Sequence, residues 1–311
     1  MIYLHRLNGK GCDRMNMLYP KIEGYLRPIN DADKECSGKL VDYYIKTAYN
    51  ACSSGDYRND YVDICNLKAI IKQGVRCLDF EIYSIQNRPV VATSTSDNFH
   101  IKETFNSIPF NSVMDTIRNY AFSGGTCPNP TDPVLIHLRC KSTNRKMYTK
   151  LAQIFKANAD VLLGAGFSYH SKGDTLGKTP LLSLRGKIII IMERTNNAFF
   201  HNQPLMEFVN MVSNSTFMRK YRFQEIEDGH DKRELIQFNR AGMTIVLPNK
   251  GDNPGNPDSK LCRENGCQLV AMRYQMTDDA LSKNTTFFNR KGYAFVLKPE
   301  NQRDKPRTSP P

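Results

Sequence analysis

The hydrophobic and polar positions from about residue 41 onward fall into two patterns that alternate along the chain. Short apolar runs rich in β-branched residues predict strands. The clearest of these runs are residues 75–83, 89–92, 134–140, 187–192, 243–247, 267–274 and 292–297. Between them, apolar residues spaced by three and four predict amphipathic helices. The clearest helical segments are residues 65–73, 110–122 and 144–158.

This alternation of strands and helices predicts a parallel sheet covered by helices. The run of four isoleucines at 188–191 is apolar on both faces, as in a buried parallel strand. A length of 311 residues allows one large α/β barrel or two ordinary domains. Because no internal repeat or low-complexity block interrupts the pattern, a single (β/α) barrel is the simplest architecture. A doubly wound open sheet is the alternative on pattern alone.

Polar segments interrupt the pattern in three places. Residues 1–40 are mixed and polar, with glycines and prolines that break any long period, so we expect a wrapping or docking extension. Residues 196–233 are rich in turn-forming residues and predict a linker between half-barrels at 41–195 and 234–300. Residues 301–311 are charged and proline-rich, which predicts a flexible tail.

Composition and charge narrow the class of protein. Hydrophobic residues make up 40% of the chain and charged residues 24%, which excludes a disordered protein. The excess of 43 Lys and Arg over 31 Asp and Glu gives a net charge of +12. This charge favours a partner such as an anionic membrane surface, nucleic acid or an acidic protein, or it simply keeps the chain soluble.

The cysteines and the hydropathy of the chain indicate the cellular compartment in which we expect the protein. Nine cysteines are scattered along it, with no CxxC pair of the kind that binds zinc, so we expect reduced thiols. The N-terminus lacks the apolar segment of a signal peptide. No stretch approaches the ~18 apolar residues of a membrane span. We therefore expect a soluble intracellular protein.

Two acidic residues on one predicted strand are the first candidate site. In the strand at 75–83, the period of two places Asp79 and Glu81 on one face. Carboxylates near the C-terminal end of a barrel strand lie where such folds have their active sites. The alternative is a strand whose two acids face solvent.

A second strand adds a cation to this candidate site. In residues 134–140 the same alternation places His137 and Arg139 on one face. An inward arginine requires an anionic partner, because an unpaired buried guanidinium is very unfavourable. We therefore predict that Arg139 bridges Asp79 and Glu81.

Eight sequence blocks carry a resemblance to a known family through their order and spacing. They are YYIKTAYNAC (43–52), DICNLKAIIKQGVRCLDFEIY (63–83), PVVATST (89–95), FNSVMDTIRNYAF (110–122), DPVLIHLRCKS (132–142), SLRGKIIIIMER (183–194), ENGCQLVAMRYQM (264–276) and GYAFVLKPE (292–300). Together they resemble the X and Y catalytic halves of the phosphoinositide-specific phospholipases C. The resemblance implies a distorted TIM (β/α)8 barrel whose two halves are joined by a linker.

The resemblance also implies a phosphoric diester hydrolase with two catalytic histidines and a Ca²⁺ ion. One histidine serves as general base for the inositol 2-hydroxyl, and Tyr49 occupies its position. A tyrosine with a pKa of about 10 is a poor base at neutral pH. Thr93 stands in place of the second histidine and cannot carry its positive charge.

The family's metal ligands are an asparagine and three acids. Asn50 matches the asparagine, and Asp79 and Glu81 match two acids in reversed order. Arg139 stands where the last acid is expected, and a cation there repels Ca²⁺. The resemblance therefore implies a former metal site from which calcium has been lost.

The positions that would hold the inositol phosphates are changed as well. Ile191 and Glu193 align with two substrate-binding lysines, and Ile245 and Leu247 align with the arginine and tyrosine of the Y half. Residues 1–40 and 301–311 are too few for the PH and C2 modules of the family, so we do not expect membrane targeting in its usual manner.

These losses together predict a pseudoenzyme that acts as a binding or structural scaffold. A general base or an electrostatic stabiliser is each worth about 10²- to 10⁴-fold in rate. One alternative is a structural component of a larger assembly with protein partners, such as a large DNA virus particle. Another is an active phosphodiesterase on inositol phospholipids, with an altered mechanism that uses His137, Asp79, Glu81 and Glu193.

Overall fold

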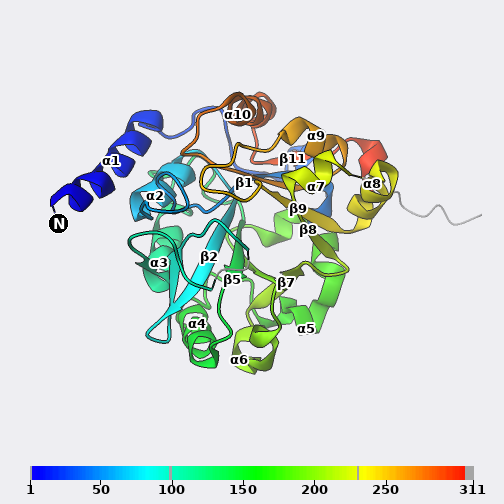
Figure 1. Cartoon of the computed structure of the whole chain (residues 1–311). Helices are drawn as coiled ribbons and strands as arrows, with labels where there is room; N and C mark the ends of the chain where they lie inside the picture. Colours follow the sequence, from blue (N-terminus) through cyan, green and yellow to red (C-terminus); the bar gives the residue numbers. More distant parts are fainter. Residues whose placement is uncertain (1, 98–99, 230, 305–311) are drawn as a thin grey trace, which may run out of the picture.

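The computed structural model describes residues 2–97, 100–229 and 231–304. Within them, eight parallel strands form a nearly closed barrel, and helices form a ring around it (Figure 1). The hydrogen-bonded order is β7-β6-β5-β2-β1-β10-β9-β8, so the barrel is open between β7 and β8. The barrel strands are β1 (Tyr43–Ala48), β2 (Cys77–Ile85), β5 (Val134–Cys140), β6 (Ile188–Glu193), β7 (Val209–Ser213), β8 (Met218–Arg222), β9 (Met243–Leu247) and β10 (Leu269–Met272). The predicted single barrel is confirmed.

Short antiparallel strands extend the wall of the barrel. β3 (Arg88–Ala92) pairs with β2 and with β4 (Ile108–Pro109), while β11 (Phe295–Leu297) pairs with β1. The β2–β3 hairpin turns through Gln86 and Asn87, whose φ angles are 50° and 62°. This left-handed turn matches the twist of the paired strands.

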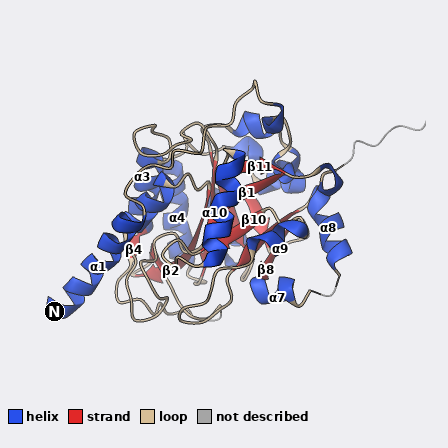
Figure 2. Ribbon diagram, turned by 90° about the horizontal axis from the view of Figure 1, so that it is seen from above, coloured by secondary structure: helices blue, strands red, loops and turns tan. Residues whose placement is uncertain are grey.

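The helices lie on the outside of the barrel, and Figure 2 shows α1 extending away from the rest. The α-helices are α1 (Ile2–Leu18), α2 (Ile64–Lys72), α3 (Phe110–Tyr120), α4 (Arg145–Ala157), α5 (Tyr169–Lys172), α6 (Gln203–Met206), α7 (Phe223–Glu227), α8 (Lys232–Ala241), α9 (Ser259–Glu264) and α10 (Asp279–Lys291). Short 3₁₀ helices are Lys34–Cys36, Leu40–Asp42, Ala165–Phe167, Gly173–Lys178, Leu181–Leu184, Ala198–His201 and Glu300–Gln302. None of the described helices is both long and apolar enough to cross a bilayer.

Side-chain caps determine where several helices begin. The side chains of Asp63, Asn144 and Asp278 accept backbone N–H groups in the first turns of α2, α4 and α10. Each cap satisfies a donor that the helix itself leaves unpaired. At the other end, Gly292 terminates α10 in the left-handed conformation, with φ of 76°.

Two apolar layers meet at the barrel strands. Leu78 and Ile136 point outward and pack beneath the helices, whereas Cys77 and Leu135 point into the barrel. Because strand side chains alternate, the later inward positions of β2 and β5 carry acidic and basic residues at the C-terminal end of the barrel. The fold thus places the candidate site above an apolar barrel interior.

The segment 196–233, which we expected to be an inserted linker, contains α6, β7, β8 and α7. β7 pairs with β6 and β8 pairs with β9, so these residues are part of the barrel wall. The short strands follow a polar stretch, and β8 itself has the half-polar sequence MRKYR. Because polar residues interrupt both strands, neither forms the kind of apolar run that predicts a strand.

The N-terminal segment differs from the prediction, and most of the C-terminal tail is not described by the structure. Residues 1–40 contain α1, a helix of 17 residues, although we expected Gly9 and Gly11 to break any long period. Gly11 lies against Ser54, where an added Cβ would be 2.6 Å from the Ser54 Cβ, so the glycine allows close packing. Most of the predicted flexible tail, residues 305–311, lies outside the described residues.

The expectation of reduced thiols is wrong for one pair of cysteines. Cys12 of α1 and Cys65 of α2 form a disulfide across 53 residues of sequence. The other seven cysteines are free and buried. Such a distant pair leaves no spacing signal in the sequence.

Candidate functional site

Arg139 lies at the centre of a buried polar cluster at the C-terminal ends of β1, β2 and β5. Its Nε donates to Asp79 Oδ1 at 2.9 Å, and its Nη1 donates to Glu81 Oε1 at 2.7 Å. Its Nη2 donates to Asp79 Oδ2 at 2.7 Å and to Asn50 Oδ1 at 2.9 Å. The predicted bridge between the two acids is therefore confirmed, and Asn50 completes it.

Backbone geometry brings Asn50 to this cluster. Asn50 follows β1 with φ of 43°, a left-handed conformation that asparagine tolerates well. Its backbone N–H donates to Asp79 Oδ2 at 3.1 Å, so main chain and side chain both contact the cluster. Asn50, Asp79, Glu81 and Arg139 are all buried.

The charges of the cluster stabilise one another. Burial alone would raise the pKa values of Asp79 and Glu81, but Arg139 outweighs burial together with His137 at Asp79 and with Lys250 and Lys141 at Glu81. The pKa of Asp79 lies well below its usual range, and that of Glu81 is lowered to about 2. Burial lowers the pKa of Arg139, but the two acids and Tyr49 raise it above its ordinary value. All three groups are charged at neutral pH.

Tyr49, which the family resemblance aligns with the general base, is packed between two arginines. The Arg139 guanidinium lies 4.7 Å from the centre of its ring, and Arg222 Nη1 donates to its hydroxyl at 3.2 Å. Burial raises the pKa of Tyr49, but Arg139, Arg222 and Lys250 together leave it below the ordinary value. The ordinary pKa that we assumed from the sequence is therefore wrong. The side chain is nonetheless buried, with its hydroxyl bonded to Arg222.

His137 forms a relay in the order Ser–His–Asp. Its Nδ1 lies 2.7 Å from Asp79 Oδ1, and its Nε2 lies 2.8 Å from Ser213 Oγ at the end of β7. Because an ionised carboxylate only accepts, Nδ1 donates to Asp79, and in a neutral ring Nε2 then accepts from Ser213. This order serves nucleophilic catalysis where the serine faces a substrate. Here all three side chains are fully buried, so the relay joins β2, β5 and β7.

The residues around Glu81 complete its hydrogen bonding. Tyr83 donates its hydroxyl to Glu81 Oε2 at 2.7 Å, and the Ser94 backbone N–H donates to the same oxygen at 3.0 Å. Thr93, which stands in place of the second histidine, instead donates its hydroxyl to the backbone oxygen of Tyr57 at 3.0 Å. Thr93 thus lies beside the cluster without a side-chain bond to its acids.

A second layer of cations surrounds Asp97 at the rim of the barrel. Arg222 of β8 donates to both carboxylate oxygens of Asp97, at 2.5 and 3.1 Å. Lys141 and Lys250 lie 3.5 and 3.3 Å from Asp97 Oδ1, and Lys250 is also 3.4 Å from Glu81 Oε1. Burial raises the pKa of Asp97, but Arg222, Lys250 and Arg139 hold it far below its usual range. This layer was not predicted from the sequence, and Arg222 was hidden because β8 was not recognised as a strand.

The four positions aligned with substrate-binding residues have separate environments. Ile191, Ile245 and Leu247 lie in the apolar interior of the barrel, where their side chains offer no hydrogen-bond donor. Glu193 accepts a hydrogen bond from Lys220 Nζ at 2.7 Å. The structure does not bring these four side chains to one phosphate-binding surface.

A calcium ion does not fit the donor set in this arrangement. Ca²⁺ takes about 6–8 oxygen ligands. The side-chain oxygens of Asn50, Asp79 and Glu81 instead accept hydrogen bonds from Arg139, whose charge lies between them. A divalent cation would have to displace a buried guanidinium from its two acidic partners.

Family models match both halves of the chain. The model for the phosphatidylinositol-specific phospholipase C X domain matches residues 36–194, and the model for the Y domain matches residues 187–301. The chain belongs to this phospholipase C family. The Y-domain match includes the segment 196–233 that we expected to be a linker. No curated protein matches the chain in sequence.

Solved structures share the fold of this phospholipase C family member. PLC21 from L. pealei is 19% identical with a TM-score of 0.70, and PLC21 from S. officinalis is 19% identical with a TM-score of 0.67. Each match covers 86% of this chain but only 38% of the PLC21 chain. A calcium-dependent phosphoinositol-specific phospholipase C from Pseudomonas sp is 11% identical, with a TM-score of 0.54, and the match covers 86% of this chain and 97% of that one.

Proposed function

We propose that this chain is a catalytically inactive phospholipase C-like protein that acts as a binding or structural scaffold. The observation that carries the proposal is the Arg139 guanidinium, which is bonded to Asn50, Asp79 and Glu81. These are the oxygens that the family resemblance assigns to calcium. A buried, charged side chain occupies their hydrogen-bonding capacity and leaves the protein without its metal.

The positions of the two family histidines support the same proposal. The Tyr49 hydroxyl is bonded to Arg222, and the Thr93 hydroxyl is bonded to a backbone oxygen of Tyr57. Neither side chain is an imidazole that could accept a proton and return it near neutral pH. Loss of the metal and of both histidines removes about 10²- to 10⁴-fold in rate for each role.

A scaffold requires a partner, and the charge of the chain suggests its nature. The net charge of +12 favours an acidic surface, and we propose a protein partner within a larger assembly. A cytoplasmic complex or a large DNA virus particle would offer such a surface. An anionic membrane or a nucleic acid is the second class of partner that this charge fits.

The competing function is phosphodiester hydrolysis by an altered mechanism. The His137–Asp79 pair favours it, because a histidine oriented by a carboxylate is a common general base. The burial of His137 and the bond of its Nε2 to Ser213 argue against it. A substrate could reach this ring only if the top of the barrel opened.

An assay of inositol phosphate release separates the two functions. Phosphatidylinositol and its bisphosphate in vesicles are incubated with the full chain, with calcium and with a chelator, beside an active family member. We expect release at the background rate in both conditions. Calcium-dependent release would refute the proposal. Calcium-independent release that is lost in His137→Ala, but kept in an exposed control such as His201→Ala, would establish the altered mechanism.

A further inference from the structure

Helix α1 is attached to the barrel through its C-terminal half. Met15 is buried in the core beneath the outer helices, and the Arg14 guanidinium donates to the backbone oxygen of Ser54. Gly11 lies against Ser54 as well. Figures 1 and 2 both show the N-terminal part of α1 extending away from the body of the barrel. The attachment therefore depends on a short stretch around residues 11–15.

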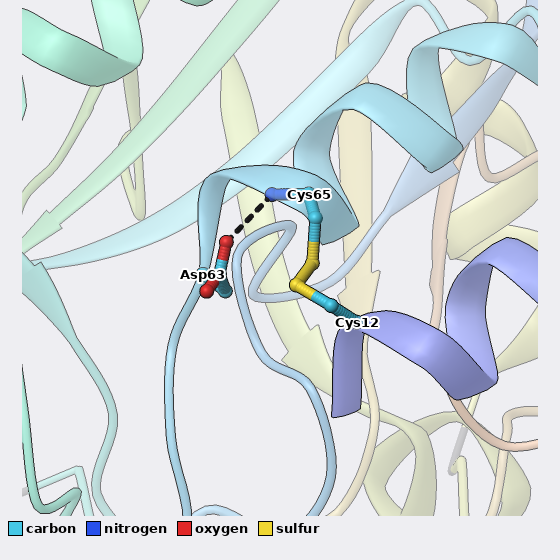
Figure 3. Close-up of side chains that lie close together, drawn as sticks. All are labelled: Cys12, Asp63 and Cys65. Atoms are coloured by element: carbon cyan, nitrogen blue, oxygen red, sulfur yellow. Dashed lines mark hydrogen bonds between the residues drawn. A yellow bond between two sulfur atoms is a disulfide. The ribbon is translucent and has the colours of Figure 1, made fainter. Parts of the chain in front are cut away.

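A disulfide lies in the middle of this stretch. Cys12 of α1 is bonded to Cys65 in the first turn of α2, with their Cα atoms 5.7 Å apart (Figure 3). Both residues are partly exposed, whereas the other seven cysteines are buried. Small thiols and disulfides from solution can therefore reach this pair more readily than any other cysteine of the described chain.

The two sulfur atoms differ in their surroundings. Cys65 is two residues after the N-cap Asp63, which accepts the Cys65 backbone N–H at 2.8 Å. The N-terminus of a helix favours a thiolate, because unpaired N–H groups place partial positive charge there. Cys12 lies inside α1, far from the N-terminus of that helix. The Asp63 carboxylate lies close to both sulfur atoms and so opposes a thiolate on either cysteine. The helix N-terminus is the difference between them, and it makes Cys65 the better leaving group when the bond is cleaved.

We propose that Cys12 and Cys65 form a reversible thiol–disulfide site that fastens α1 to the barrel, with small thiols and disulfides of the glutathione type as co-reactants. In reduction, the thiolate of one small thiol attacks Cys12 Sγ, the S–S bond breaks and Cys65 leaves as a thiolate. A second small thiol attacks the mixed disulfide and releases Cys12. The two cysteines gain the two protons, and one small disulfide is formed; oxidation is the reverse reaction.

The redox state of this disulfide determines how firmly Arg14 of α1 is held in a polar cavity at the barrel rim. Arg14 of α1 lines a cavity of about 270 Å³ together with Asp56, Asp60 and Arg273. Arg273 is buried, and its guanidinium donates to the backbone oxygens of Pro254 and Gly55. Reduction removes the covalent link and leaves α1 held by its few noncovalent contacts, so Arg14 can leave this cavity more often.

Amide hydrogen exchange of the full chain tests the proposal. The protein is equilibrated with oxidised glutathione or with excess reduced glutathione, and exchange is measured in peptides that cover residues 9–18. We expect exchange in the reduced protein to be at least about tenfold faster, because loss of a cross-link lowers the free energy of local opening. Peptides of β5 should be unchanged.

Variants provide matched controls. Oxidised Cys12→Ser and Cys65→Ser should exchange in α1 like the reduced protein, while Asp13→Ser, an exposed neighbour, should keep the response to glutathione. Mass mapping of the unmodified chain gives a measurement that no folding defect affects. It should find the Cys12–Cys65 cross-linked peptide after oxidation and two alkylated thiols after reduction.

Three results would overturn the proposal. The first is free Cys12 and Cys65 thiols after equilibration with oxidised glutathione. The second is equal exchange of α1 in both redox states. The third concerns Asp63, because its carboxylate and the two sulfur atoms lie within 4.8 Å of one another. One zinc ion per chain in the reduced protein, lost in Cys12→Ser, would make the pair a metal site instead.

Discussion

Arg139 is the residue on which the buried polar cluster depends. Its guanidinium makes four hydrogen bonds to two acids and an amide, all of them buried. A buried ion pair adds little net stability compared with an apolar substitute, but removal of one partner leaves an uncompensated charge. Replacing one charged residue of the cluster should therefore lower the free energy of unfolding. Replacing the acids and the arginine together should lower it less.

Arg139→Met should destabilise the protein by about 3–5 kcal/mol, because it leaves Asp79 and Glu81 charged and unpaired in the barrel. Urea unfolding followed by far-ultraviolet circular dichroism measures this, since the chain has no tryptophan. Adding Asp79→Asn and Glu81→Gln should recover part of the loss. Arg118→Met, which removes an exposed ion pair with Asp160, is the matched control and should cost less than about 1 kcal/mol. Similar losses in the two arginine variants would contradict the role of the cluster.

Acid should unfold the protein partly through Glu81. Its pKa is lowered from 4.5 to about 2 in the folded state, so its contribution is fully present above pH 4.5 and is lost as the pH falls toward 2. The free energy of unfolding, measured at several pH values in this window, should fall less steeply in Glu81→Gln. Glu300→Gln, at a highly exposed position, should retain the slope of the unmodified chain. An unchanged slope in Glu81→Gln would show that Glu81 is not paired in solution.

At the scale of elements, the strands that the sequence predicts well are those with long apolar runs. β5 and β9 have the predicted bounds, and β6 differs from its prediction by one residue at each end. β7 and β8 were missed because polar residues interrupt both of them: β7 has the sequence VNMVS, and β8 has polar side chains on both faces. Their pairing depends on neighbours distant in sequence, which local periodicity does not encode.

Two glycines in α1 should respond oppositely to the same substitution. Gly9 has open space around it, so Gly9→Ala should stabilise the helix by up to about 1 kcal/mol through higher helix propensity. Gly11 lies so close to Ser54 that Gly11→Ala should push α1 off the barrel. Amide exchange in residues 9–18 should slow in the first variant and accelerate in the second. Equal effects would contradict the close packing of α1 on residue 54.

At the scale of the whole molecule, the sequence predicted the barrel and the centre of its site, but not the rim. The alternation in β2 and β5 was enough to place Asp79, Glu81 and Arg139 together. Ser213 and Arg222 lie on β7 and β8, so the error over residues 196–233 hid both of them. A family resemblance identifies the positions of motifs, whereas the side chains that bond to them from distant segments are seen only in the folded structure.

The whole molecule thus keeps the shape of a phospholipase C barrel with a different chemical centre. Its apolar interior and its ring of helices do not depend on the metal, because Arg139 and the rim cations supply the positive charge that the acids require. The barrel fold itself does not require the family's chemistry, which is why the proposed scaffold role is compatible with it.

Calorimetric titration of calcium into the full chain tests the central claim most directly. We predict no saturable heat for the unmodified chain up to millimolar calcium. Arg139→Glu, prepared in calcium, restores the acid that the family resemblance places there and should gain one site. Arg118→Glu makes the same charge change away from the cluster and should gain none. Micromolar binding of one calcium ion by the unmodified chain would contradict the account.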